Sequence, residues 1–283
     1  MSNAILQRFD LDGKTVAITG GGGALCGTMA DALGTMGVKV AVLDISLEKA
    51  EIRAQAITRA GGTALPFACD VLDAVQLRRC CEALANAWGP PDLLINGAGG
   101  NDARGSTSVE FEEPVKEGAT AQSFFDLDPA GFRHVFDLNF MGTFLATQIF
   151  SRGMVARGRG SIVNISSMSA FMPLTKVAAY SAAKAAVSNF TQWLAVHFSH
   201  AGVRVNALAP GFFMTEQLRF LHVDPATGEL LPRARQVIAH TPMGRYGQPD
   251  DLIGALVWLL SDAYTFVTGV VVPIDGGFSS YSI

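Results

Sequence analysis

Short runs of apolar and β-branched residues alternate with helical patterns along the chain. Such runs, bounded by glycine or polar residues, are typical of buried strands. They predict strands at residues 15–19, 38–43, 63–69, 93–96, 161–165, 203–207 and 269–274. The helices predicted between them cover residues 25–36, 46–59, 74–88, 128–154, 179–200 and 249–261. This order predicts an α/β fold, a doubly wound, Rossmann-type domain with a mostly parallel seven-stranded sheet and helices on both faces.

Two segments interrupt this rhythm, at about residues 99–127 and 212–241. The first is polar and shows no clear period, and the second is irregular or helical. Long segments of this kind in a compact domain are usually functional. No linker or shift in composition divides the chain, so we expect residues 1–283 to form a single domain that carries both segments as insertions.

Composition narrows the class of protein. Hydrophobic residues make up 49% and charged residues 16% of the 283 residues, so the chain can bury a large core. The net charge of −4 argues against nonspecific nucleic-acid binding, which needs a basic surface. The longest apolar stretches, 254–260 and 266–274, are too short to span a bilayer. Residues 1–12 lack the apolar core of a signal peptide, and we expect a cytoplasmic protein.

The four cysteines are Cys26, Cys69, Cys80 and Cys81, and none has the spacing of a zinc ligand pair. Adjacent Cys80 and Cys81 within a helical pattern argue against a disulfide framework. Reduced thiols are expected, with no metal site.

A glycine-rich turn follows the first predicted strand, in residues 19–27 (TGGGGALCG). The free N–H groups of the following helix could bind a pyrophosphate, and glycine permits close approach. The alternative is a flexible strand-to-helix turn. Asp44 favours the first interpretation, because it ends the second strand 24 residues after Gly20, where a carboxylate binds the adenosine ribose. Such a carboxylate repels a 2′-phosphate, so NAD is expected over NADP, unless Asp44 is merely a helix cap or a solvated side chain.

Further residues at the ends of strands fit the same dinucleotide. Asp70 could bind the adenine amino group or be a turn residue, and the small residues 96–99 leave room for the adenosine side. The predicted cofactor contacts in this half are Gly20, Gly22, Gly23, Ala24, Leu25, Asp44, Asp70, Val71, Asn96, Ala98 and Gly99.

Tyr180 and Lys184 lie four residues apart at the start of a predicted helix, and therefore on one face. A phenol is a poor acid–base group at neutral pH, but a nearby ammonium lowers its pKa. Ser167 follows the fifth strand, where its hydroxyl could hydrogen-bond a substrate carbonyl at the edge of the sheet.

Taken in order, these motifs resemble the short-chain dehydrogenase/reductase family over about residues 11–279. The resemblance rests on the glycine turn, Asn96-Gly97-Ala98-Gly99, Asn139, Ser167, Tyr180 with Lys184, Pro210-Gly211 with Thr215, and Asp275-Gly276-Gly277. It implies that Tyr180 is the general acid–base and that Lys184 lowers its pKa and holds the nicotinamide ribose. It also implies that Ser167 polarises the carbonyl and that Asn139 holds a water of the proton relay. Pro210, Gly211, Phe213 and Thr215 would lie near the nicotinamide.

The sequence departs from the family pattern at two places. Ala24 and Cys26 stand where the family usually has glycine, and Gly97 replaces the second asparagine of Asn-Asn-Ala-Gly. The family pattern therefore does not decide which atoms of the glycine turn contact the phosphates.

Segments around the predicted substrate side resemble the D-mannonate oxidoreductase (D-fructuronate reductase) branch of the family. The matching segments are 124–127, 171–176, 209–213 and 241–245. This branch implies interconversion of a ketone and a secondary alcohol on a sugar acid. A carboxylate substrate needs a cation, for which Lys176, Arg104 and Arg219 are candidates, and Asn101 and His222 could bind hydroxyls. For each of these residues alone, a surface role is the simpler interpretation.

Two other functions compete with this one. A 3-oxoacyl carrier-protein reductase typically uses NADPH, which Asp44 disfavours. The sequence also lacks a basic cluster that could bind an acidic carrier protein. A dinucleotide-sensing regulator on the same fold often lacks the tyrosine or lysine, and both are present here. Besides a small-molecule substrate, the expected partner is a second copy of the chain. The helix at 179–200 is apolar over more than one face, so we expect a homo-oligomer, a tetramer or a dimer.

Overall fold

The computed structural model describes residues 2–112, 121–215, 222–225 and 227–282. At its centre is a seven-stranded sheet in the order β3-β2-β1-β4-β5-β6-β7, and every neighbouring pair of strands is parallel. The prediction of a doubly wound α/β fold is thereby confirmed, with the sheet entirely parallel. The strands are β1 (Thr15–Thr19), β2 (Lys39–Asp44), β3 (Thr63–Ala68), β4 (Leu93–Asn96), β5 (Gly160–Ile165), β6 (Val203–Pro210) and β7 (Val271–Ile274).

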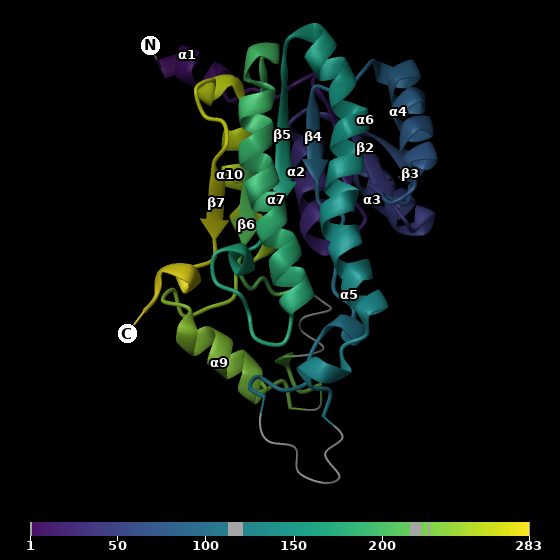
Figure 1. The fold of residues 1–283 in the computed structure, drawn as a ribbon. Helices are drawn as coiled ribbons and strands as arrows, with labels where there is room; N and C mark the ends of the chain where they lie inside the picture. Colours follow the sequence, from purple (N-terminus) through teal and green to yellow (C-terminus); the bar gives the residue numbers. More distant parts are fainter. Residues whose placement is uncertain (1, 113–120, 216–221, 226, 283) are drawn as a thin grey trace.

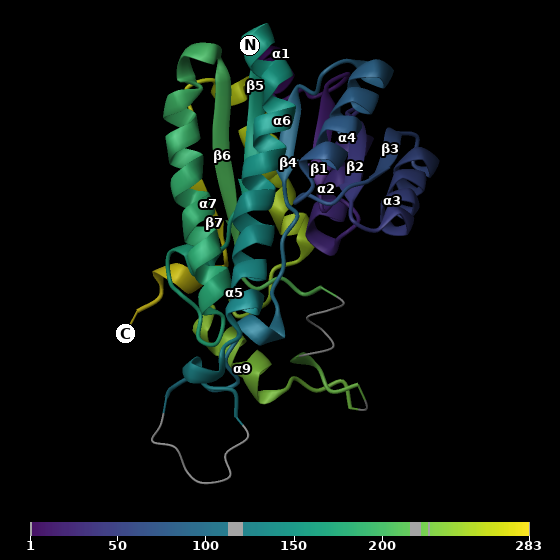
Figure 2. The ribbon, with the colours of Figure 1, turned by 45° about the vertical axis from the view of Figure 1, so that its right-hand side comes forward.

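Helices cover both faces of the sheet, as Figures 1 and 2 show. The helices are α1 (Ser2–Gln7), α2 (Ala24–Thr35), α3 (Leu47–Arg59), α4 (Ala74–Trp88), α5 (Pro129–Phe136), α6 (Gly142–Arg157), α7 (Ala178–His197), α9 (Pro232–His240) and α10 (Ile253–Leu260).

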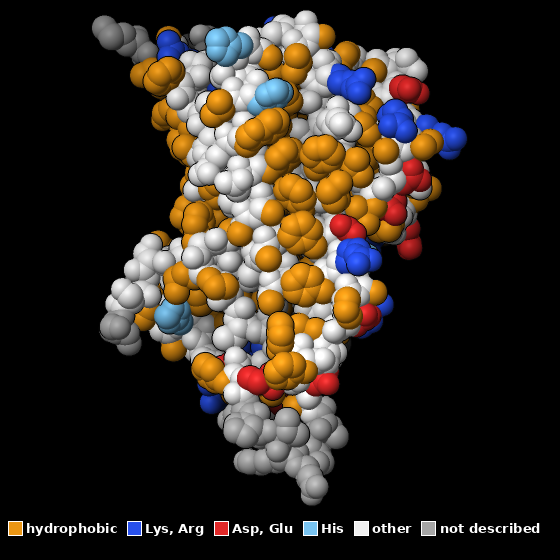
Figure 3. Space-filling view, in the orientation of Figure 1, with side chains coloured by type: hydrophobic (Ala, Val, Ile, Leu, Met, Phe, Trp, Pro, Cys, Tyr) orange, Lys and Arg blue, Asp and Glu red, His pale blue; other side chains and the backbone are white. Residues whose placement is uncertain are grey.

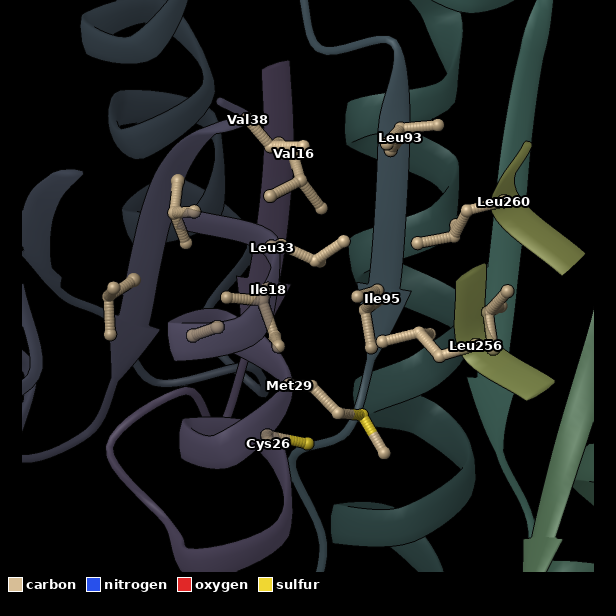
Figure 4. Close-up of a cluster of buried hydrophobic side chains, with 14 of the residues drawn as sticks. Val16, Ile18, Cys26, Met29, Leu33, Val38, Leu93, Ile95, Leu256 and Leu260 are labelled. Carbon is tan, nitrogen blue, oxygen red and sulfur yellow. The ribbon is translucent and has the colours of Figure 1, made fainter. Parts of the chain in front are cut away.

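Alternate residues of each strand supply two separate cores. Val16 and Ile18 of β1 pack with α2, α3 and α10, whereas Ala17 between them packs with α4, α6 and α7. Figure 4 shows the first of these cores, where Met29 and Leu33 of α2 lie near Ile95 of β4, and Leu256 of α10 lies beside Ile95. Burial on both faces explains why the strands are almost continuously apolar.

The sequence patterns locate most helix starts correctly. Ser46 caps α3 by accepting from the Lys49 N–H, and Asp128 caps α5 by accepting from the Ala130 N–H, with Pro129 as the first helical residue.

The helix predicted for residues 128–154 is present and continues to Arg157, but it is not α-helical throughout. The chain forms one wide π-helical turn at Asp137–Met141 between α5 and α6. Such turns often occur at functional sites, and this one contains Asn139. The predicted helix at 179–200 also ends earlier, at His197, and the last strand begins at Val271 instead of residue 269.

The carboxyl ends of the strands meet at one edge of the sheet, at the lower end of the molecule in Figure 1. The described parts of both insertions lie beyond this edge, and α9 belongs to the second one. The first insertion contains two short 3₁₀ turns, Ala103–Gly105 and Phe124–Asp126, and no longer helix within its described residues. Parallel sheets bind their ligands beyond the carboxyl ends of their strands.

Candidate active site

The glycine turn after β1 leads directly into α2 and leaves the helix N-terminus open. Gly23 is the N-cap residue and provides no side-chain hydrogen bond. Gly20 has a φ of +67°, which favours glycine, and its ideal Cβ would lie 2.9 Å from the Ala98 Cα. The turn therefore fits a pyrophosphate, because free N–H groups and close backbone approach are both present.

Asp44 lies beside this turn at the end of β2. Its Oδ2 accepts from the Gly22 N–H (3.0 Å) and its Oδ1 accepts from the Ser46 N–H (3.0 Å). These bonds hold the carboxylate at the edge of the turn, 9% exposed. It is thus placed where a ribose bound along the turn would present its hydroxyls, and it is not a solvated surface group.

The segment after β4 lies against the glycine turn and the catalytic residues. Thr19 Oγ1 accepts from the Gly97 N–H (3.0 Å) and the Ala98 N–H (3.2 Å), a contact that the sequence analysis did not foresee. An ideal Cβ on Gly99 would lie 2.5 Å from Asn139 Oδ1 and 3.3 Å from Lys184 Nζ. Gly99 therefore leaves the room that these two side chains occupy.

Tyr180, Lys184 and Ser167 converge at the carboxyl edge of the sheet. Burial raises the pKa of Tyr180, and a side-chain hydrogen bond with Ser167 acts in the opposite direction. Lys184 Nζ lies 5.5 Å from the centre of the Tyr180 ring and donates to the Ile165 carbonyl (2.8 Å). Burial lowers the pKa of Lys184 to about 8. The cluster combines a phenol, a hydroxyl and an ammonium, the groups needed to exchange a proton with a carbonyl oxygen.

Asn139 is fully buried in the π turn, and its amide clamps the loop after β4. Its Nδ2 donates to the carbonyls of Gly100 (2.7 Å) and Val135 (2.8 Å), and its Oδ1 accepts from the Gly100 N–H (3.3 Å). The side chain thus fixes the floor of the site. The water-holding role implied by the family resemblance stays a prediction.

The segment after β6 closes the other side of the site. The Gly211 N–H donates to the Ile274 carbonyl (2.9 Å), which joins the ends of β6 and β7. Phe213 is 5% exposed and its ring packs against Gly247, so any contact with a cofactor would come from its backbone. Thr215 is the last described residue before residues 216–221.

The side chain of Asn96, a predicted cofactor contact, is held by partners inside the fold. Its Nδ2 donates to Thr147 Oγ1 (2.8 Å) and to Asn164 Oδ1 (2.8 Å), and the side chain is 2% exposed. The amide is therefore buried between the sheet and α6. The motif alone does not show which face of the strand the Asn96 side chain occupies, because side chains alternate between faces. Any contact of Asn96 with a cofactor would come from its backbone, and that contact stays a prediction.

Asp70 and Val71 lie in the turn after β3. Asp70 Oδ1 accepts from the Leu72 N–H (2.9 Å), which is the turn role; the adenine contact stays a prediction. Val71 is buried against Gly142 at the start of α6.

The candidate substrate residues have different surroundings. Arg104 is neutralised within its own loop by Asp102 (2.6 Å) and Asp128 (3.7 Å). Asn101 donates to Ser106 Oγ (2.9 Å). His222 is 4% exposed with its Nδ1 2.7 Å from the Tyr246 hydroxyl, so it connects the second insertion to the segment that follows it. Arg219 lies outside the described residues.

Lys176 differs from these residues in its backbone and its partners. Its φ is +74°, the one positive value among the described residues other than glycine. Its carbonyl accepts from the Thr107 N–H of the first insertion (2.9 Å). Strained positions of this kind are often found at ligand sites.

The described part of the chain contains no disulfide, no candidate metal site and no membrane-spanning helix. All four cysteines are free thiols. Within residues 2–112, 121–215, 222–225 and 227–282, no three His, Cys, Asp or Glu side chains are grouped to hold a metal ion. No helix in the same ranges is long and apolar enough to cross a membrane.

The chain is similar to several known oxidoreductases. Residues 24–279 match the model of a family described as Enoyl-(Acyl carrier protein) reductase. "Uncharacterized oxidoreductase UxuB" of Bacillus subtilis is 51% identical over 274 residues, covering 96% of this chain and 97% of its own length. "5-keto-D-gluconate 5-reductase" of Escherichia coli is 31% identical over 270 residues, covering 95% of this chain and 96% of its own length. A crystal structure from Haemophilus influenzae, named a "putative D-Mannonate oxidoreductase" with bound NAD, superposes with a TM-score of 0.91. It has 45% identity and covers 96% of this chain and 97% of its own.

Proposed function

The chain belongs to the short-chain dehydrogenase/reductase family and is a nicotinamide-dependent oxidoreductase acting on CH–OH groups, and from this premise we propose that its substrate is a sugar acid of the D-fructuronate/D-mannonate type. The reaction interconverts a ketone and a secondary alcohol, with NAD(H) favoured because of Asp44.

The proposed mechanism assigns one task to each side chain of the site. The nicotinamide supplies or accepts the hydride when it is bound. Ser167 donates a hydrogen bond to the substrate oxygen, and Tyr180 gives its phenolic proton to that oxygen during reduction and takes it back during oxidation. The positive charge of Lys184, 5.5 Å from the Tyr180 ring, stabilises the phenolate. Asn139 holds the Gly100 loop in place beside Lys184 and takes part in the relay that exchanges the proton with water.

The observation that carries the substrate class is the setting of Lys176. The residue lies between Ser167 and Tyr180 in the chain, and the Thr107 N–H binds its carbonyl. Within the described residues Lys176 forms no ion pair, in contrast to Arg104. It can therefore offer an unneutralised ammonium to a carboxylate at the junction of the catalytic loop and the first insertion.

The printed names of two similar proteins support the same class. One is named for D-mannonate and the other for 5-keto-D-gluconate, and both are acids of six-carbon sugars.

The test compares D-fructuronate with D-fructose, which has an uncharged hydroxymethyl group in place of the carboxylate. We expect Lys176→Met to lower kcat/KM for fructuronate roughly tenfold or more, the effect of losing one charged hydrogen-bond partner. Turnover of fructose should change little. Lys176→Gly removes the same charge but suits the positive φ, so an equal loss in both variants assigns the effect to the charge and not to the backbone.

Two further variants complete the design. Arg104→Met should cost less than Lys176→Met, because Asp102 and Asp128 already neutralise the guanidinium. Tyr180→Phe lacks the phenolic proton, so its remaining activity gives the background rate of turnover. Equal losses on fructuronate and fructose would remove Lys176 from substrate binding. A wild-type enzyme that does not turn over fructuronate would refute the substrate proposal and leave only the general dehydrogenase.

A further inference from the structure

Residues 97–99 form a spacer between the glycine turn and the catalytic residues. On one side, Thr19 Oγ1 accepts from the Gly97 and Ala98 N–H groups. On the other side, the Gly99 Cα faces Asn139 Oδ1 and Lys184 Nζ. A small displacement of this spacer would move the wall of the coenzyme site and disturb the proton relay together.

Cys26 determines where this spacer can lie. An ideal Cβ on Gly97 would overlap Cys26 Sγ and lie 3.1 Å from the Thr19 carbonyl. Cys26 belongs to the first turn of α2 and is 5% exposed. Sulfur therefore fills the space directly over the Gly97 Cα, and the glycine is needed because of the cysteine.

The same contact connects the two departures from the family pattern. Cys26 adds a side chain to the first turn of α2, and Gly97 removes one from the segment that faces it. We propose that Cys26 and Gly97 act as one steric unit that sets the separation between α2 and residues 97–99, and that Cys26 is a positioning residue for the nicotinamide coenzyme.

The chemistry of Cys26 suits a packing role. Burial raises the pKa of its thiol to about 12, so the group stays neutral at physiological pH and can lie beside the glycine turn as a small apolar side chain. Cores are close-packed, and an added methyl group forces either a strained rotamer or a backbone shift. A shift of residues 97–99 is the outcome that would affect the coenzyme.

The experiment exchanges one heavy atom between the two positions. The variants are Gly97→Ala, Cys26→Ala and the double variant. In the double variant the sulfur is gone, and the new Cβ lies 3.5 Å from the Cβ of residue 26, at ordinary contact distance. One tight contact remains, 3.1 Å from the Thr19 carbonyl oxygen, so a small adjustment of the backbone is still needed. Gly254→Ala in α10 is the matched control, since nothing lies within 4 Å of its ideal Cβ. The measurements are the Kd for NADH by fluorescence titration and the Tm of the coenzyme-free protein.

We expect Gly97→Ala to weaken NADH binding about tenfold, as overpacking of a close contact would. The double variant should recover to within about threefold of the wild type, because the volume is restored. The effect must appear in the Kd for NADH. If Gly97→Ala lowers Tm but binds NADH like the wild type, the contact is only structural and the proposal is wrong.

The double variant supplies a second criterion that does not depend on Gly97→Ala being well folded. In the Cys26→Ala background the sulfur-sized space is empty, so adding the methyl group at position 97 should improve NADH binding. If it worsens binding, the two residues do not act as a unit. All these readouts use coenzyme alone, so they are independent of the sugar-acid proposal.

Discussion

Lys184 carries a positive charge into a buried position beside the reacting groups. The side chain is 4% exposed, and burial lowers its pKa from 10.5 to about 8. Because the folded protein binds this proton less tightly than the unfolded chain, burial of the ammonium reduces stability at every pH below about 8. In the mechanism we propose, Lys184 stabilises the phenolate of Tyr180 at a cost to the stability of the fold.

Replacing Lys184 with Met should reveal this cost as a function of pH. Between pH 8 and 10.5 the unfolded wild type holds a proton that the folded form has lost, so wild-type stability rises with pH over this window. The variant lacks this rise. The unfolding free energy of Lys184→Met should exceed that of the wild type most at pH 7, by up to about 3 kcal/mol for a pKa shift of this size. The difference should shrink toward pH 10.

The measurement is Tm of the coenzyme-free protein at pH 7 and pH 10. Lys39→Met, at the start of β2, controls for the loss of a lysine charge in general. A difference in Tm that does not change between the two pH values would mean that the Lys184 ammonium is not destabilising in the folded state.

We propose that Asp44, at the other end of the site, governs the choice between NAD(H) and NADP(H). We expect Asp44→Ser to narrow the ratio of kcat/KM for NADH over NADPH, because it removes the carboxylate that would repel a 2′-phosphate. The substitution also removes the two carboxylate oxygens that accept hydrogen bonds from the N–H groups of Gly22 and Ser46. Because these bonds hold the glycine turn, NADH binding should weaken as well. A wild type that uses NADPH as well as NADH would contradict this role.

At the scale of elements, a buried polar network joins the centre of the sheet to two helices. Asn96 of β4 bonds to Asn164 of β5 and Thr147 of α6, and Asn164 Nδ2 donates to Thr191 of α7 (2.9 Å). All four side chains are at most 2% exposed. Because Tyr180 and Lys184 also belong to α7, this network sets the height of the catalytic helix on the sheet.

Thr147→Val tests whether the network stabilises the fold or serves the coenzyme. Valine keeps the shape of threonine but leaves one Asn96 N–H without its acceptor. The unfolding free energy should fall by about 1–3 kcal/mol, while the Kd for NADH stays unchanged. Urea unfolding and NADH titration measure the two quantities. A weaker Kd for NADH with normal stability would show that the Asn96 side chain serves coenzyme binding.

The elements also show what the sequence could predict. Period and caps locate the strands and most helix starts, because burial on both faces and local capping leave traces in neighbouring residues. The π turn at Asn139 and the positive φ of Lys176 leave no such trace, since both depend on contacts with Gly100 and Thr107, distant in sequence. The same holds for the Cys26–Gly97 contact. The candidate catalytic residues can be named from the sequence because their motifs are local. The orientation of Asn96 and the pairing of Arg104 with Asp102 and Asp128 needed the structure.

At the scale of the whole molecule, α7 and the helical stretch from α5 through the π turn to α6 present an aromatic surface to solvent. Figure 3 shows hydrophobic side chains gathered in a column over these helices. The rings follow one another in contact: Phe136 with Phe140 (5.7 Å between centroids), Phe140 with Phe190 (5.6 Å), and Phe190 with Trp193 (6.2 Å). The inner side of α7 already packs on the sheet through Val187, Leu194 and their neighbours. Large contiguous apolar patches of this kind usually mark an interface.

The last prediction is that this surface joins two copies of the chain in a homo-oligomer. In a two-fold arrangement the same patch faces itself, so one charge introduced there appears twice in the interface and is desolvated against its own image. Trp193, 56% exposed, lies within the patch, and Trp193→Asp should shift the protein toward monomers in light scattering at micromolar concentration. Ile52→Asp on α3 is the matched control, because Ile52 is also exposed (61%) but lies outside the patch, and it should leave the assembly intact. A wild type that is already monomeric, or an oligomer that survives Trp193→Asp unchanged, would show that this surface is not the interface.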